Sequence, residues 1–194
     1  MNTTVVLLLV AVLSLLTGAV SKISDLFNDD GLEWFPGADP LSGVLWAATG
    51  SALVLLDPQV AALWLATVMY WFLRSKLDHF NHAFAGVCIS GTGVFCAARG
   101  KVDLTVFVGL FAWLAVSGYL NTWLKNRHAA DSPGLRRFLR LRLRYYAGPI
   151  LIALLTTNAL PAVSVLAGMA GTEAVTEWWR RSATKVDVGT ELSR

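Results

Sequence analysis

The chain has 194 residues, of which 55% are hydrophobic and only 15% are charged, whereas about 25% of the residues in a typical soluble domain are charged. This composition, with a mean hydropathy of +0.56, argues against an ordinary soluble domain and indicates that lipid is the solvent. The formal net charge of +3 is therefore interpreted as loops that face anionic head groups, not as a nucleic-acid surface.

Six apolar stretches, each nearly or fully long enough to cross a bilayer, alternate with short segments that hold nearly all the charge. This segregation is typical of a polytopic membrane protein. Because backbone groups in hydrocarbon must be satisfied internally and the stretches show no strict alternation, we expect an all-α transmembrane helical bundle rather than a barrel. The whole chain, 1–194, is predicted to be one domain. The predicted helices are Val5–Val20, Leu41–Leu56, Val60–Leu73, Ala83–Ala98, Leu104–Leu124 and Ala147–Gly168.

The first stretch has two interpretations. Ala19-Val20-Ser21 resembles a signal-peptide cleavage site, but no Lys or Arg precedes the apolar core, so an uncleaved first helix is favoured. Residues 21–42 then form an acidic connection in which the only basic residue is Lys22. The Gly and Pro residues of this connection predict turns, with one short interfacial helix around 24–27.

The second and third stretches are separated only by Asp57-Pro58, where Pro cannot continue a helix and the preceding Asp favours a turn. Each arm is about 23 Å long as a helix, which is short for a hydrocarbon core of about 30 Å. Two arrangements fit: a tight hairpin of two crossing helices, giving six crossings, or a re-entrant arm, giving five. In the second arrangement Asp57 lies at membrane depth, where an ionisable group is a functional candidate.

A cluster of ionisable residues precedes the fourth stretch. Asp78, His79 and His82 are spaced to share a helix face, which makes them the candidate catalytic residues. They could relay a proton, bind a divalent metal, or steer a phosphate together with Arg74 and Lys76. The favoured alternative is an interface turn with an Arg74–Asp78 pair and two solvated histidines, and no cofactor is predicted.

The fourth helix is expected to start with a capping box formed by Ser75 and Asp78. It is rich in small residues, which let neighbouring backbones approach closely. We therefore expect this helix to be central in the bundle. Its small-xxx-small pairs are Gly86 with Ser90 and Gly93 with Ala97.

Residues 125–146 form the most basic segment. On a helix near 134–146 the arginines gather on one side and the leucines take the rest, which is typical of an amphipathic interfacial helix on anionic lipid. The tail, 171–194, carries paired tryptophans and is predicted to be a second interfacial contact. With Arg74 and Lys76, the candidate lipid-binding or anion-binding residues are Arg136, Arg137, Arg140 and Arg144.

The distribution of Lys and Arg predicts the orientation. With six crossings, 21–42, 74–82 and 125–146 share one side, which holds ten of the sixteen basic residues. The positive-inside tendency then places 125–146 in the cytoplasm and both termini outside a cell (inner) membrane.

The sixth stretch contains Pro161, which is expected to kink its helix, shortly after Asn158. Asn121 and Asn158 are the polar groups that we expect to face the bundle interior, where packing is their default role. Together with Asp57 they are also candidates for lining a substrate path, because broken helices are where transporters bind.

No motif in the chain specifies a chemistry, so three functions stay open and it is undecided whether the protein is an enzyme. The favoured one is a non-catalytic subunit or accessory protein of a membrane assembly. Its partners would be membrane lipids and other membrane subunits or a second copy, with no nucleic acid. The second is a small transporter, channel or substrate-binding membrane component, which predicts a polar cavity reaching mid-membrane, lined by the fourth and sixth helices. The third is a membrane enzyme acting on a lipid or phosphate head group through Asp78, His79 and His82.

Overall fold

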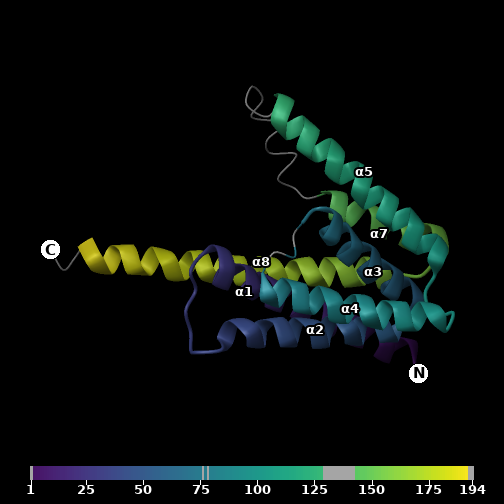
Figure 1. Ribbon diagram of the computed structural model, residues 1–194, viewed down its shortest axis with the longest axis horizontal. Helices are drawn as coiled ribbons and strands as arrows, with labels where there is room; N and C mark the ends of the chain where they lie inside the picture. The colour runs from purple at the N-terminus through teal and green to yellow at the C-terminus, as the bar shows by residue number, and fades with distance from the viewer. Residues whose placement is uncertain (1, 76, 78, 129–142, 192–194) are drawn as a thin grey trace.

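The computed structural model describes residues 2–75, 77, 79–128 and 143–191. Seven helices and no strands form in these ranges (Figure 1), so the predicted all-helical fold is confirmed. The helices are α1 (Thr3–Asp29), α2 (Ala38–Leu56), α3 (Pro58–Leu73), α4 (Phe80–Ala98), α5 (Leu104–His128), α7 (Leu143–Thr156) and α8 (Leu160–Glu191).

Four of the helices are long and apolar enough to cross a membrane: α1, α2, α4, and α5 over Leu104–Arg127. Two shorter apolar helices, Pro58–Leu73 and Tyr145–Thr156, lie among them. A multi-pass helical membrane protein is therefore indicated by length and composition. The predicted number of six crossings is not established, because only four of the described helices are both long and apolar enough, and the long helix α8 is not among them.

The acidic connection is shorter than predicted, because α1 continues through residues 21–29. The amide of Asp30 donates to the carbonyl of Leu26 at 3.2 Å, and the amide of Leu32 donates to the same carbonyl at 3.0 Å. The remaining connection ends at Gly37, whose φ of 89° suits glycine. The last two turns of α1 therefore present their carboxylates from a helix and not from a loop.

The predicted tight hairpin between α2 and α3 is present. Asp57 is the N-cap of α3, and its side chain accepts hydrogen bonds from the backbone amides of Gln59 and Val60. Pro58 occupies the first turn of the helix, where its missing N–H would be unpaired in any case. The two helices consequently run side by side in opposite directions.

The central helix is α3 rather than α4. Half of the residues of α3 are buried, and the helix packs against α2, α4, α5 and α8. By contrast, α4 packs mainly against α2 and leaves large side chains such as Val87 and Val94 exposed. The close approach of α4 to α2 depends on Gly43 and Gly50 of α2, because a Cβ atom at either position would overlap α4.

The sixth predicted helix is in fact two antiparallel helices, α7 and α8, joined by residues 157–159. Thr157 has a φ of 57°, which breaks the helix. The side chain of Asn158 then accepts from the amide of Leu160 at 3.1 Å and caps α8. Pro161 falls in the first turn of the new helix, where proline is tolerated, so it does not kink a continuous one. The chain reverses here, and the first residues of α1 and the last residues of α8 lie at opposite ends of the molecule (Figure 1), which does not fit the expectation that both termini lie on one side of the membrane.

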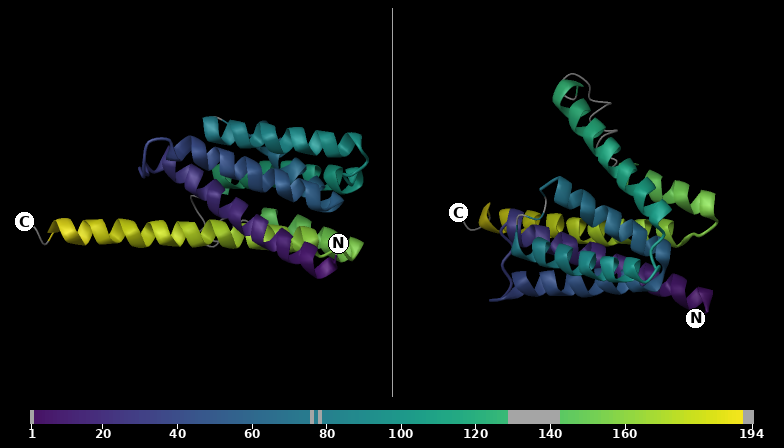
Figure 2. Two further views of the ribbon diagram at one scale, coloured as in Figure 1. Left: turned by 90° about the horizontal axis from the view of Figure 1, so that it is seen from below. Right: turned by 45° about the vertical axis from the view of Figure 1, so that its right-hand side comes forward.

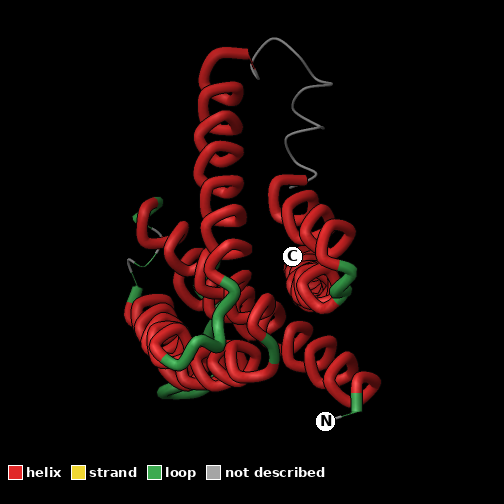
Figure 3. Tube along the Cα trace, turned by 90° about the vertical axis from the view of Figure 1, so that its right-hand side faces the viewer, coloured by secondary structure: helices red, strands yellow, loops and turns green. Residues whose placement is uncertain are grey.

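Helices α1 and α8 form the closest helix pair of the fold and cross each other in Figure 2. A Cβ atom on Gly18 would overlap the backbone of Gly168, and one on Gly171 would overlap the carbonyl of Leu15. Small residues at the crossing thus bring the two backbones together, as they do between membrane helices in general. By contrast, the C-terminal half of α5 rises away from the other helices (Figures 1 and 3).

Candidate functional site

A cavity of about 490 Å³ lies between α1, α3 and α8, with further wall residues from α2, α4, α5 and α7. Each of the three main helices lines it with residues three or four positions apart, so each contributes one face. The lining on α1 runs from Gly18 to Asp29, a distance of about 16 Å along a helix. The three helices run in the same direction, so the cavity extends along the bundle.

The polarity of the cavity changes along this length. At the end where α1 and α3 finish, it is lined by Asp25, Asp29 and Arg74. At the inner end it is lined by apolar side chains such as Leu63 and Leu110. A molecule that follows the cavity therefore passes from charged to apolar surroundings.

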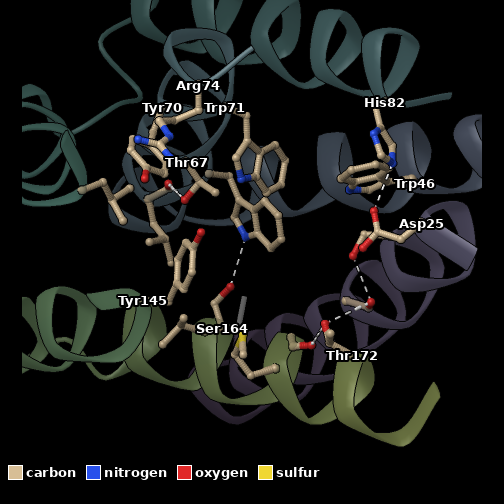
Figure 4. Close-up of a pocket in the computed structure, with 18 of the residues that line it drawn as sticks. Asp25, Trp46, Thr67, Tyr70, Trp71, Arg74, His82, Tyr145, Ser164 and Thr172 are labelled. Carbon is tan, nitrogen blue, oxygen red and sulfur yellow. Dashed lines mark hydrogen bonds and ion pairs between the residues drawn. The ribbon is translucent and has the colours of Figure 1, made fainter. Parts of the chain in front are cut away.

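Aromatic side chains form much of the wall in between, as Figure 4 shows. The rings of Trp46 and Trp71 meet edge to face with their centroids 5.5 Å apart. Trp64 lies deeper, and its indole N–H donates to the hydroxyl of Ser164 at 3.1 Å. Ser164 is also hydrogen-bonded to Ser14 at 2.7 Å, so this polar contact is satisfied inside the bundle.

The charged end contains a close pair. Nε2 of His82 lies 3.2 Å from Oδ1 of Asp25, which is within ion-pair distance, although the angle is not that of a hydrogen bond. The side chain of His82 is 10% exposed and that of Asp25 is 42% exposed. The imidazole ring also contacts Trp46 and His79 edge to face, with centroids 5.3 Å and 5.7 Å away.

A buried asparagine fixes the start of α4 and therefore the position of His82. Asn81 is fully buried and donates to Oδ1 of Asp39 at 2.6 Å, while it accepts from Asn28 at 2.9 Å. Its side-chain oxygen also accepts from the amide of His82 at 2.8 Å. These bonds join α1, α2 and α4, which is how the fold holds an imidazole against a carboxylate of α1.

The predicted ionisable cluster is partly reproduced in this cavity. His79 and His82 both line it together with Arg74, whereas Lys76 and Asp78 lie outside the described residues. The helix begins at Phe80 with His79 as its N-cap and without a side-chain cap hydrogen bond. The predicted capping box at Ser75 is therefore wrong, because the N-cap is His79. His79 lies at the start of the helix and not within it, although its ring still contacts that of His82.

The predicted anion-binding strip falls mostly outside the described residues. Arg136, Arg137 and Arg140 are among the residues not described, and so is the predicted interfacial helix up to residue 142. Arg144 belongs to the first turn of α7, but its side chain is also outside the description. The assignment of these residues to lipid or anion binding stays a prediction.

The predicted substrate-path residues do not line the cavity. Asp57 and Asn158 meet at the opposite end of the bundle, where Nδ2 of Asn158 lies 3.4 Å from Oδ1 of Asp57. Both side chains cap helices there. Asn121 lies on α5, and its Oδ1 is buried without a hydrogen-bond partner.

Sequence reasoning missed Asp25, Trp46 and Ser164 as parts of one site. Asp25 was predicted to lie in the acidic connection, within a short interfacial helix at 24–27, although Ser21, Asp25 and Asp29 follow each other at four-residue spacing. That spacing, continued from Gly18, was the available signal for a helical face. Trp46 and Ser164 carried no comparable signal, because their neighbours in space come from distant parts of the chain.

The chemistry of the cavity is that of a binding site with one charged end. The part of the chain that the structure describes contains no group of three or more metal-ligating side chains. Its ionisable side chains, Asp25, Asp29, Arg74, His79 and His82, can attract a charged group, while the tryptophans can bury an apolar one. No protein-family model, curated protein or solved structure matches this chain, so the argument for its function rests on the cavity.

Proposed function

We propose that the protein is a multi-pass protein of the cell (inner) membrane that binds a small solute, as the substrate-binding component of a transport process. The observation that carries this proposal is the cavity between α1, α3 and α8. A cavity that reaches into the bundle from a charged mouth fits the transport hypothesis, although α4 contributes only His82 to its lining, and an accessory subunit packed solid does not need one. Its volume of about 490 Å³ is within the range of about 300 to 1,000 Å³ typical of small-molecule sites.

The walls of the cavity support binding in a further respect. They come from seven helices, and they combine a few charged groups with a large aromatic surface, as ligand sites commonly do. Hydrogen bonds between helices flank the cavity, through Ser14 with Ser164 on one side and Asn81 with Asp39 on the other. These bonds hold the surrounding helices in place.

The distribution of Lys and Arg suggests how the protein is oriented in the membrane. Among the described residues, Arg99 and Lys101 are the only Lys or Arg at the end of the bundle that holds the α4–α5 turn. The other described basic residues lie toward the opposite end, at which the cavity has its charged mouth. By the positive-inside tendency, the cavity opens to the cytoplasm.

The test is chemical access to a cavity residue in membranes. In a background carrying Cys88→Ala and Cys96→Ala, Met169→Cys places a thiol on the part of α8 that lines the cavity. Ala170→Cys is the matched control, because it is the next residue of α8 but is exposed and outside the cavity lining, on a face that this proposal assigns to lipid. The reagents are small membrane-impermeant methanethiosulfonates, one with a trimethylammonium group and one with a sulfonate group, applied to inverted vesicles and to spheroplasts.

We expect at least one of the two reagents to modify Met169→Cys in inverted vesicles but not in spheroplasts, and Ala170→Cys to stay unmodified in both. Modification of Met169→Cys from the outside only would overturn the orientation. No modification by either reagent from either side would mean that the cavity is closed to water, and the accessory-subunit hypothesis would then replace this proposal.

A further inference from the structure

We infer that the ligand of the cavity is an organic ammonium ion that also carries an oxygen acceptor and an apolar group. This inference rests on the proposed solute-binding function and specifies its substrate class. Three observations lead to it: the balance of charge at the mouth, the aromatic wall beside that charge, and a buried indole N–H without a partner.

The balance of charge at the mouth favours a cation. The permanent charges that line it are the carboxylates of Asp25 and Asp29 and the guanidinium of Arg74. Arg74 is exposed at the rim, and Figure 4 places it on the opposite side of the cavity from Asp25. Asp25, in contrast, belongs to the cavity wall itself, because it lies beside the nearly buried imidazole of His82. Together these three groups carry one net negative charge.

The aromatic wall begins directly beside this carboxylate. The side chains of Asp25, His82, Trp46 and Trp71 form a continuous row, in which each one contacts the next. A cation held near Asp25 is therefore separated from the first indole ring only by the imidazole of His82, and the faces of indole rings attract positive charge. Quaternary and tertiary ammonium groups suit such a wall, because their methyl groups bury apolar surface while the charge stays near the carboxylate.

The third observation is the indole nitrogen of Trp46. The residue is 4% exposed, and its Nε1 is buried without a hydrogen-bond partner among the described residues. An indole N–H can only donate, and leaving a buried donor unpaired is unfavourable. Trp64 provides the contrast, since its N–H is bonded to Ser164. Trp46 is one of the residues that line the cavity (Figure 4). Because its Nε1 is itself covered, a ligand oxygen would supply the missing acceptor after a small movement of the ring.

The experiment compares two small ligands of matched shape. Benzoylcholine carries a quaternary ammonium, an ester carbonyl and a phenyl ring, whereas benzoylglycine carries a carboxylate in place of the ammonium. Binding to purified protein in nanodiscs is measured by isothermal titration calorimetry, with empty nanodiscs as the blank. We expect saturable binding of benzoylcholine and binding at least about tenfold weaker for benzoylglycine, as expected when attraction to a carboxylate is replaced by repulsion.

Three charge variants make the test specific. Asp25→Asn should weaken benzoylcholine binding by about fivefold, which is the scale of a partly exposed ion contact. Arg74→Gln should strengthen binding, by about twofold, because it removes a repulsive charge from the rim. Asp30→Asn is the control: Asp30 also ends α1, but it lies outside the cavity and pairs with Lys22 at 3.9 Å. It should leave the affinity unchanged.

A purely structural role for Asp25 cannot produce opposite changes in the Asp25 and Arg74 variants. Equal binding of the two ligands, or tighter binding of benzoylglycine, would overturn the inference about the ligand. If Met169→Cys were nevertheless modified in membranes, solute binding would stand with a different substrate class. If Met169→Cys were not modified and neither ligand bound, both proposals would fall together.

Discussion

The two ends of the bundle use similar polar side chains in opposite ways. At the end with the α2–α3 and α7–α8 turns, Asp57 accepts from the amides of Gln59 and Val60. Gln59 in turn bonds to Asp103 at 3.3 Å and to Thr156 at 3.1 Å. At the other end, Asp25, Asp29 and Arg74 border a cavity. One end is closed by its own hydrogen bonds, and the other leaves charge facing an open space.

This difference distinguishes polar groups that stabilise the fold from polar groups that remain available to bind a ligand. In a low-dielectric interior, a polar group that is fully bonded stabilises the fold, and one that is left unpaired carries a cost. Asp57 therefore has a sufficient structural explanation, whereas the unpaired N–H of Trp46 and the half-exposed Asp25 do not. Variants at the two ends should accordingly change different measured quantities, and this can be tested.

The largest expected effect comes from Gly18, where α1 packs directly against α8. A Cβ atom at Gly18 would overlap the backbone of Gly168, so a larger side chain would disturb the packing on which both ends of the bundle depend. Gly18→Leu should separate α1 from α8 and destabilise the protein by more than about 4 kcal/mol, which is the range of severe core disruptions. The measurement is the yield of monodisperse protein in detergent, followed by thermal unfolding. Gly18→Ala, a milder change, should still fold but at a clearly lower midpoint.

The matched control for this prediction is Gly91→Leu. Gly91 also lies in a membrane-length helix, but a Cβ atom there meets nothing within 4 Å. The variant should keep the yield and the midpoint of the native protein. A Gly18→Leu variant as stable as Gly91→Leu would contradict the close α1–α8 contact.

A smaller effect is expected at the closed end. Asp57→Ala removes the N-cap of α3 and should lower the free energy of unfolding by about 0.5 to 2 kcal/mol. Asp57→Asn keeps a capping side chain and should stay close to the native value. Thermal unfolding in detergent gives the comparison.

The Asp57 variants should leave the modification of Met169→Cys unchanged, because Asp57 does not line the cavity. Asp25→Asn should do the reverse, changing ligand affinity with little change in the unfolding midpoint. If Asp57→Ala altered access to the cavity as strongly as it altered stability, the separation of the two ends would not hold.

The smallest effect is a gain in stability. Thr157 adopts a φ of 57°, a conformation that costs a β-branched residue about 1 to 2 kcal/mol relative to glycine or asparagine. Thr157→Asn should relieve part of that cost and raise the midpoint by about 2 °C. Thr157→Val keeps the branched side chain and should bring no gain. Equal midpoints for the two variants would argue against strain at this turn.

The fold class could be predicted from the sequence because charge segregation and Pro58 leave few alternatives. The boundaries of α2 and α3 came out within three residues, since Asp57-Pro58 is a local signal. The reversal at Thr157 could not be predicted, because the apolar composition of a stretch is the same whether it forms one helix or two. The number of membrane-spanning helices depends on such breaks, so hydropathy alone does not determine it.

The site was less predictable than the fold. Arg74, His79 and His82 were named from their chemistry, and all three border the cavity. The partner of His82 was missed because Asp25 is separated from it by more than fifty residues of sequence. Whether the N–H of a tryptophan is left unpaired beside a cavity depends on packing. In the sequence, nothing distinguishes Trp46 from the other tryptophans, of which the chain has eight in all.

The pairing of α1 with α8 also determines when the protein can mature during synthesis. Ser14 and Ser164, which bond to each other, are 150 positions apart. At about 5 to 20 residues per second, the ribosome needs about 8 to 30 s between the two. During that interval α1 must wait in the membrane, and the face around Gly18 that later packs against α8 is exposed to lipid or to a chaperone. Loss of the chain's end, through a premature stop, would leave that face permanently uncovered and mark the product for quality control.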